Sequence, residues 1–161
     1  MHLRAQQLID RLQLRPHPEG GFYREIFRSA LLVRPDDERP PRTALTTIYF
    51  LLAEGQHSRW HRVRSDEVWH AYEGEGLELF QSPPDLTAID RIALGSSHAG
   101  EEPVHTVPAG WWQAARPRGP FSLVGCTVGP GFDFADFSFL RDDTALVEQL
   151  ATRAPELSEL V

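Results

Sequence analysis

The sequence predicts an all-β fold, a sandwich or a barrel, because two patterns agree. Short apolar-rich runs recur at regular spacing through most of the chain, and turn-forming glycine and proline residues separate them. Many short strands punctuated in this way are typical of sandwiches and barrels, whereas βαβ folds alternate strands with long helices. The expected strands are residues 45–52, 58–63, 67–72, 77–81, 89–94, 104–107, 112–115 and 121–128.

A short helix is expected at each end of the strand-rich region. Ala5, Leu8 and Leu12 fall at helical spacing over residues 3–13, before Pro16 forbids continuation. A second helix is expected over residues 143–153, where an aspartate caps its start. The 161 residues fit one domain, 1–161, with the barrel over about 20–140. The phenylalanine-rich run 132–139 is expected to be a strand or cover that packs rings against the barrel.

Composition narrows the possible functions. The net charge of −7 repels phosphate backbones, so we expect no nucleic-acid partner. The chain has no lysine, which excludes a Schiff base on one of its side chains. Its one cysteine, Cys126, lies in an apolar run and is expected to be a buried small side chain. Without an apolar signal segment or a run of ~20 apolar residues, we expect a cytoplasmic protein and no membrane contact.

Two motifs carry the chemistry. The first has a glycine at 55, His61, Val63 at the next inward position, Glu67 and a glycine at 74. The second is Pro108-Ala109-Gly110 followed by Gln113. Their spacing resembles the two cupin motifs, whose side chains converge inside a jelly-roll barrel and hold a divalent metal.

A more specific resemblance covers residues 8–140. The segments 18–25, 60–70, 107–110, 123–128 and 130–134 look like the fifth cupin family, a domain of unknown function. The resemblance implies a cupin double-stranded β-helix (jelly-roll barrel) that forms a homodimer and is similar to sugar-nucleotide epimerases. It implies no established reaction.

The chain departs from the cupin metal motif at two of the four ligand positions implied by the resemblance. Valine at 63 cannot bind a metal, and the amide of Gln113 is a poor ligand for the softer ones. We therefore expect no cofactor; the alternative is a divalent metal held by His61, Glu67 and Gln113. Strict alternation along a strand places His70 on the opposite face from Glu67, so it could join this set only through a bulge.

His61 and Glu67 are the first candidates for catalysis, as an acid–base pair in a half-dry barrel. The alternative is a buried hydrogen-bonded pair without chemistry. His70 and Tyr72 could complete the site as second acid and donor, or could lie on the outer face of the sheet. Tyr23, Arg24, Trp69 and Gln113 are the candidate ligand-binding residues.

These residues favour a cupin that binds a small molecule whose identity the sequence does not reveal. One hypothesis is a metal-independent isomerase or epimerase acting on a sugar or sugar nucleotide through His61 and Glu67. The alternatives are a metal-dependent cupin enzyme and a module that binds a metabolite without turnover, which the fold does not distinguish.

Overall fold

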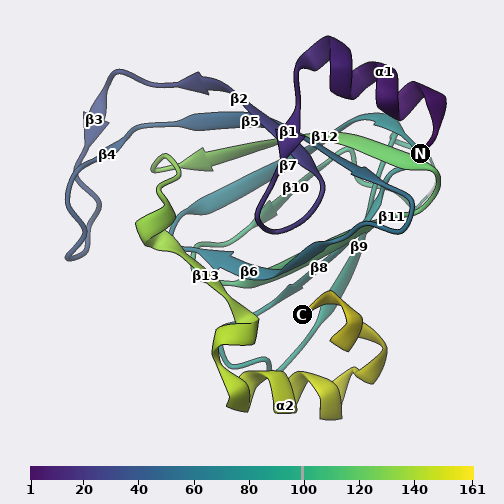
Figure 1. Cartoon of the computed structure of the whole chain (residues 1–161). Coiled ribbons are helices and arrows are strands. Elements are labelled where there is room, and N and C mark those ends of the chain that lie inside the picture. The colour runs from purple at the N-terminus through teal and green to yellow at the C-terminus, as the bar shows by residue number, and fades with distance from the viewer. Residues whose placement is uncertain (99) are drawn as a thin grey trace.

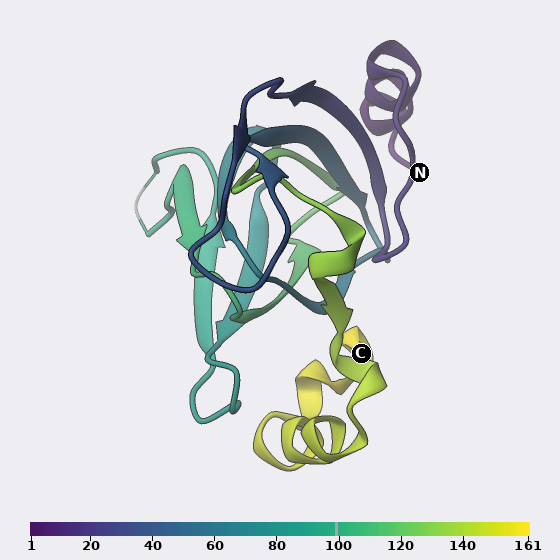
Figure 2. The same ribbon diagram turned by 90° about the vertical axis from the view of Figure 1, so that its left-hand side faces the viewer.

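The computed structural model describes residues 1–98 and 100–161 and forms a β-barrel of two facing sheets with a helix on each outer side (Figures 1 and 2). The first sheet has the order β1-β2-β5-β12-β7-β10. Its strands are β1 (Arg15–Pro16), β2 (Phe22–Arg28), β5 (Thr46–Ala53), β12 (Phe121–Gly129), β7 (Asp66–Gly74) and β10 (Val104–Val107).

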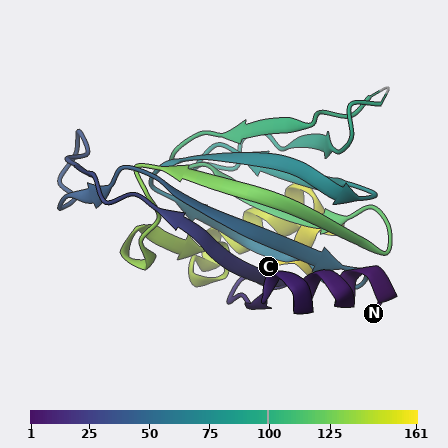
Figure 3. The same ribbon diagram turned by 90° about the horizontal axis from the view of Figure 1, so that it is seen from above.

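The second sheet has the order β13-β6-β11-β8-β9. Its strands are β13 (Phe137–Phe139), β6 (Ser58–Val63), β11 (Trp112–Pro117), β8 (Leu77–Ser82) and β9 (Asp90–Leu94). A two-stranded arm of β3 (Leu32–Val33) and β4 (Arg42–Thr43) projects beyond the barrel (Figures 1 and 3). Every pairing inside these sheets is antiparallel.

Both helices pack on the outside of the barrel. Helix α1 (Leu3–Leu12) places Ala5, Leu8 and Ile9 against β5 and β12 of the first sheet. Helix α2 (Thr144–Arg153) and the 3-10 turn η3 (Pro155–Leu160) bury Leu150 and Leu157 against Trp60 and Trp112 of the second sheet. Two further 3-10 turns, η1 (Phe134–Asp136) and η2 (Leu140–Asp142), flank β13. The predicted all-β jelly roll with a short helix at each end is confirmed.

Only one part of the barrel interior is filled with hydrocarbon. Its core contains mainly aliphatic and aromatic side chains from both sheets, Phe50, Leu52, Trp69, Leu77, Leu79, Ile92, Leu94, Val107, Ala115, Val124 and Cys126. Alternate residues of a strand face the same side, so β5 and β12 continue inward past this core with Ile48, Thr46 and Val128. Those side chains line a cavity instead of a packed interior.

No helix among the described residues is long and apolar enough to span a bilayer. The homodimer stays a prediction.

Candidate functional site

The barrel contains a cavity of about 460 Å³ between the two sheets, on the side of the β3–β4 arm and η1. This volume suits a small metabolite, because ligand pockets in proteins run from about 300 to 1,000 Å³. Its walls combine buried acids and imidazoles with phenyl rings and two arginines. The lining residues are Arg15, His17, Glu19, Tyr23, Glu25, Arg28, Thr46, Ile48, His61, Val63, Glu67, Cys126, Val128, Phe132, Asp133, Phe134 and Phe137.

Glu19 and His61 form a buried pair in the cavity wall, with Glu19 Oε2 lying 3.2 Å from His61 Nε2. The other ring nitrogen, Nδ1, lies 2.7 Å from the Arg59 carbonyl oxygen. A carbonyl oxygen only accepts, so Nδ1 carries a proton. This contact is attractive only when a proton lies on Nε2 or on the carboxyl group. The geometry therefore places the pair to share a proton beside the cavity.

The connector between β1 and β2 delivers Glu19 to this position. Its backbone oxygen accepts from Arg59 N–H at 2.9 Å, and its Oε1 accepts from the Ser58 hydroxyl at 2.8 Å. The next residue, Gly20, has φ of +118°, and a Cβ there would lie 2.0 Å from the His57 carbonyl oxygen. Only glycine fits so close to β6, and this approach holds the Glu19 carboxyl beside His61.

A chain of hydrogen bonds, from Trp69 through Gln113, holds Glu67 on the side away from the cavity. The indole nitrogen of Trp69 only donates, and it lies 2.9 Å from Gln113 Oε1. This contact fixes the amide, so Gln113 Nε2 donates to Glu67 Oε2 at 2.5 Å. All three side chains are buried. Since an N–H donor favours the ionised carboxylate, this hydrogen bond opposes the effect of burial on Glu67.

Burial is the largest cause of the pKa shifts of the acids and imidazoles in this cavity. It raises the pKa of Glu19 and of Glu67, and it lowers the pKa of His61 and of His17. For Glu67 the neighbouring His61 and the Gln113 donor work in the opposite direction. Carboxyl pKa values raised toward neutrality are suited to exchanging protons under physiological conditions.

The phenyl rings of the cavity wall come from the segment that joins β12 to α2. Phe137 stacks on the His61 ring, with centroids 5.2 Å apart and planes inclined by 16°. Phe132, Phe134 and Phe137 meet edge to face, with centroids between 4.9 and 6.2 Å apart. Strand β13 pairs with β6, so this wall is joined to the strand that carries His61.

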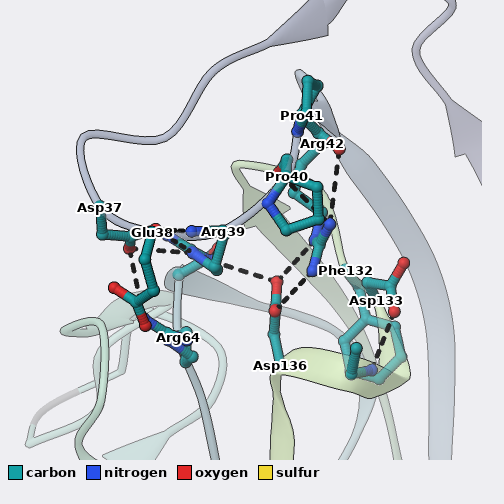
Figure 4. A network of polar contacts seen from close by, with 12 residues as sticks. Asp37, Glu38, Arg39, Pro40, Pro41, Arg42, Arg64, Phe132, Asp133 and Asp136 are labelled. Carbon is teal, nitrogen blue, oxygen red and sulfur yellow. Dashed lines mark hydrogen bonds and ion pairs between the residues drawn. The ribbon is translucent and has the colours of Figure 1, made fainter.

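An ion-pair network holds the same wall in place (Figure 4). Asp136, buried in η1, accepts from Arg42 at 2.8 and 2.9 Å and from Arg39 at 3.2 Å. Arg39 also donates to Ser65, the residue before β7, and to Asp37. The hydrogen bond from Arg42 lowers the pKa of Asp136. The network ties the base of the β3–β4 arm to the aromatic wall.

The structure brings together three of the residues predicted from the sequence. His61, Glu67 and Tyr23 all line the cavity, and Val63 faces it as the alternation from His61 required. Trp69 and Gln113 point into the barrel but lie behind Glu67, outside the cavity lining.

The other predicted residues lie elsewhere. Arg24 is exposed and donates to the Leu12 carbonyl oxygen. His70 and Tyr72 lie on the outer face of β7, where their rings stack and Tyr72 is 51% exposed. Of the two orientations considered for this pair, the structure has the outer one, because β7 alternates regularly through residues 67–71.

Sequence reasoning missed Glu19, His17 and Cys126. Cys126 is buried and lines the cavity next to Glu67, and burial raises its thiol pKa well above the usual value. Glu19 lies in a connector outside the barrel strands, so strand alternation gives no information about it. Its one signal was the following Gly20-Gly21 pair, which indicated an unusual backbone at that point.

The donor set does not fit the metal centre that the cupin fold implies. Gln113 turns its amide nitrogen toward Glu67 and its oxygen toward Trp69, so it offers no oxygen to a metal beside Glu67. Among the described residues, no three histidine, cysteine or acidic side chains converge in a geometry that could hold an ion. The prediction of a metal held by His61, Glu67 and Gln113 therefore lacks its third ligand.

Fold and site define a cupin barrel with a buried acid–imidazole cavity. The sequence matches the family model described as Cupin superfamily (DUF985) over residues 6–140, and the chain belongs to that family.

Relatives from three organisms resemble most of the chain. A hypothetical protein from Leishmania major is 35% identical with a TM-score of 0.82, over 98% of this chain and 96% of that one. Protein SO0799 from Shewanella oneidensis is 35% identical with a TM-score of 0.81, over 96% of each chain. The uncharacterized protein YML079W of Saccharomyces cerevisiae is 28% identical, over 88% of this chain and 77% of that protein.

More distant cupins share the fold alone. Oxalate decarboxylase from Bacillus subtilis is 16% identical with a TM-score of 0.56, over 91% of this chain and 36% of that one.

Proposed function

We propose that the protein is a metal-independent isomerase or epimerase that moves a proton on a sugar or similar polar small molecule bound in the cavity. The observation that carries this proposal is the buried contact of Glu19 with His61, at 3.2 Å, in a cavity that Glu67 also lines. Pairs of titratable groups with different environments are typical of acid–base sites.

The two groups divide the chemistry. Glu67, held as an acceptor by Gln113, takes a proton from the carbon next to a carbonyl group. The Glu19–His61 pair gives its shared proton to the carbonyl oxygen, so that a neutral enediol forms. The carbon that loses the proton carries a hydroxyl group. Glu67 returns its proton to the former carbonyl carbon, and the hydroxyl group of the first carbon gives its proton to the pair, which completes an isomerisation. An epimer forms when the enediol turns over before Glu67 returns the proton to the first carbon, and the new hydroxyl group on the former carbonyl carbon gives its proton back to the pair. No electrons are gained or lost in either case.

Glu67 and the Glu19–His61 pair should each accelerate the proton transfer. Positioned general acids and bases contribute about 10²- to 10⁴-fold each. Gln113 and Trp69 act through Glu67 and are positioning residues, because neither lines the cavity.

The test is exchange of carbon-bound hydrogen with D2O, followed by proton NMR over a panel of hydroxy ketones, sugars and nucleotide sugars. We expect the wild-type protein, treated with a chelator, to exchange one hydrogen in at least one compound. His61→Asn and Glu67→Gln should each slow the exchange by about 10²-fold or more. His105→Asn is the matched control, because His105 bonds Glu102 and Gln81 outside the cavity.

Three results would overturn the proposal. Exchange that survives His61→Asn would remove the mechanism, and exchange that needs added metal would favour the metal-dependent alternative. Tight binding of a compound that is recovered unchanged, with no exchange in any compound, would favour a non-catalytic binding module.

A further inference from the structure

Two arginines line the cavity, and only one of them has its charge engaged. Arg28 donates to both carboxylate oxygens of Glu25, at 3.0 and 2.8 Å, and also to the Phe132 carbonyl oxygen. Arg15 makes no ion pair with any acidic residue among the described ranges 1–98 and 100–161. Arg15 is therefore the cavity cation that remains available to a ligand.

The position of Arg15 is set by the fold. It lies in β1 directly opposite Tyr23 of β2, and its guanidinium lies over the Tyr23 ring, 5.2 Å from the centroid. The Tyr23 and His17 rings in turn meet edge to face, with their centroids 4.4 Å apart. These contacts form a continuous line from the exposed guanidinium to the connector that carries Glu19. A guanidinium held over a ring in this way still presents its N–H groups to a carboxylate or a phosphate group.

The same cavity presents apolar surface that this chain leaves uncovered. Phe134 is 57% exposed although it lines the cavity, and Phe132 and Phe137 lie beside it. Covering such rings with a flat apolar group is favourable at roughly 25 cal/mol per Å² of buried area. Aromatic rings also prefer offset or edge-to-face contact with other rings.

Charge orients a ligand that uses both features. Glu67 lies buried in the wall and Arg15 is exposed, so an anionic group is costly to desolvate beside the first and is attracted to the second. The Glu19–His61 pair and Glu67 would then face the uncharged part of the ligand, which carries the carbonyl group.

We propose that the cavity binds a small molecule that carries one anionic group, a carboxylate or a phosphate, and a planar ring. The anion pairs with Arg15, and the ring packs on Phe132 and Phe134. This inference rests on the proposed function for the chemistry between those two ends, because it names the substrate class of that same site. Binding itself can be measured without turnover.

The experiment is titration calorimetry with four probes: phenylacetate, phenyl phosphate, phenylacetamide and acetate. We expect one of the two anionic ring compounds to bind about tenfold or more tightly than phenylacetamide and acetate. Whichever binds better, the carboxylate or the phosphate, identifies the source of the anion.

Variants separate the two contacts. Arg15→Gln should bring the anionic ring compounds down to the affinity of phenylacetamide, whereas Phe134→Ser should weaken every ring compound and leave acetate unchanged. Arg34→Gln is the control, because Arg34 is exposed outside the cavity lining. Circular dichroism checks that each variant is folded.

Several outcomes would overturn the inference: no anionic ring probe binds, phenylacetamide binds as tightly as phenylacetate, or Arg15→Gln binds like the wild-type protein. Failure of the proposed function is a separate result. Arg15-dependent binding without hydrogen exchange in D2O would keep the ligand class and remove the proton transfer. His61-dependent exchange on an uncharged sugar would do the reverse.

Discussion

The two parts of the barrel interior are built from the same strands and have different properties. Strand β5 contributes Phe50 and Leu52 to the packed core, and then Ile48 and Thr46 to the cavity. Strand β12 likewise passes from Val124 to Val128. Backbone pairing is continuous through both parts, so the choice of side chain decides which part is closed.

The difference shows where apolar packing and buried polar groups are placed. The packed part excludes water with hydrocarbon that needs no polar partner. The cavity buries Glu19, His61 and Glu67, which are costly to desolvate and are held only by specific hydrogen bonds. A barrel that keeps one part dry and apolar can tolerate such groups in the other part.

The largest expected effect comes from the ion-pair network that holds the aromatic wall of the cavity. Asp136→Asn leaves the buried Arg39 and Arg42 without their shared carboxylate, which should cost about 3–5 kcal/mol of unfolding free energy. Urea denaturation measures this loss. Glu38→Gln is the control, since Glu38 pairs with Arg64 at the exposed surface and its substitution should cost far less unfolding free energy. Equal losses would show that the wall does not depend on this network.

The packed part is tested by Leu79→Ala. Leu79 is completely buried among core side chains, so its truncation should leave an enclosed void and cost about 2–5 kcal/mol. Val128→Ala on the cavity wall should cost less than the Leu79 change, because the lost methyl groups only enlarge an existing space. If thermal or urea unfolding gave the same loss for both, the contrast between the two parts would be wrong.

The smallest expected effect is a gain in unfolding free energy, for a variant of Glu67, and this gain depends on pH. Burial raises the pKa of Glu67, so the folded wild-type protein binds this proton more tightly than the unfolded chain. Its stability is therefore complete below the unfolded pKa of about 4.3 and falls as the pH rises through the folded value.

Glu67→Gln removes this titration while it keeps an acceptor for Gln113. The variant should thus gain stability over the wild-type protein as the pH rises. The gain should be about 1.4 kcal/mol for each pH unit by which folding raises the pKa of Glu67. Urea unfolding from pH 4 to pH 8 measures the difference. A difference that stays flat or shrinks with pH would mean that the pKa of Glu67 is not raised.

The sequence predicted the fold because its signals are local. The expected strand over residues 58–63 coincides with β6, and the helices end close to the prolines that limit them. Regular alternation put His61 and Val63 on the same face of their strand, and the cupin resemblance put Glu67 beside them inside the barrel. The same rule put His70 on the opposite face of its strand from Glu67, and His70 lies on that face.

The rest of the site depends on tertiary contacts that no local pattern contains. Glu19 reaches His61 through a connector held by β6. Gln113 has the right strand position to face the interior, yet Trp69 and Glu67 occupy both ends of its amide. The run 132–139 was expected to cover the barrel, but nothing in its spacing predicted that Phe137 would stack on His61.

The connector at residues 17–21 supplies half of the acid–imidazole pair without belonging to either sheet wall. Grafting a different five-residue loop there would replace the acid and leave the strands around His61 unaltered. The acid of this cavity can in that sense be exchanged by a change far smaller than any rebuilding of the barrel walls.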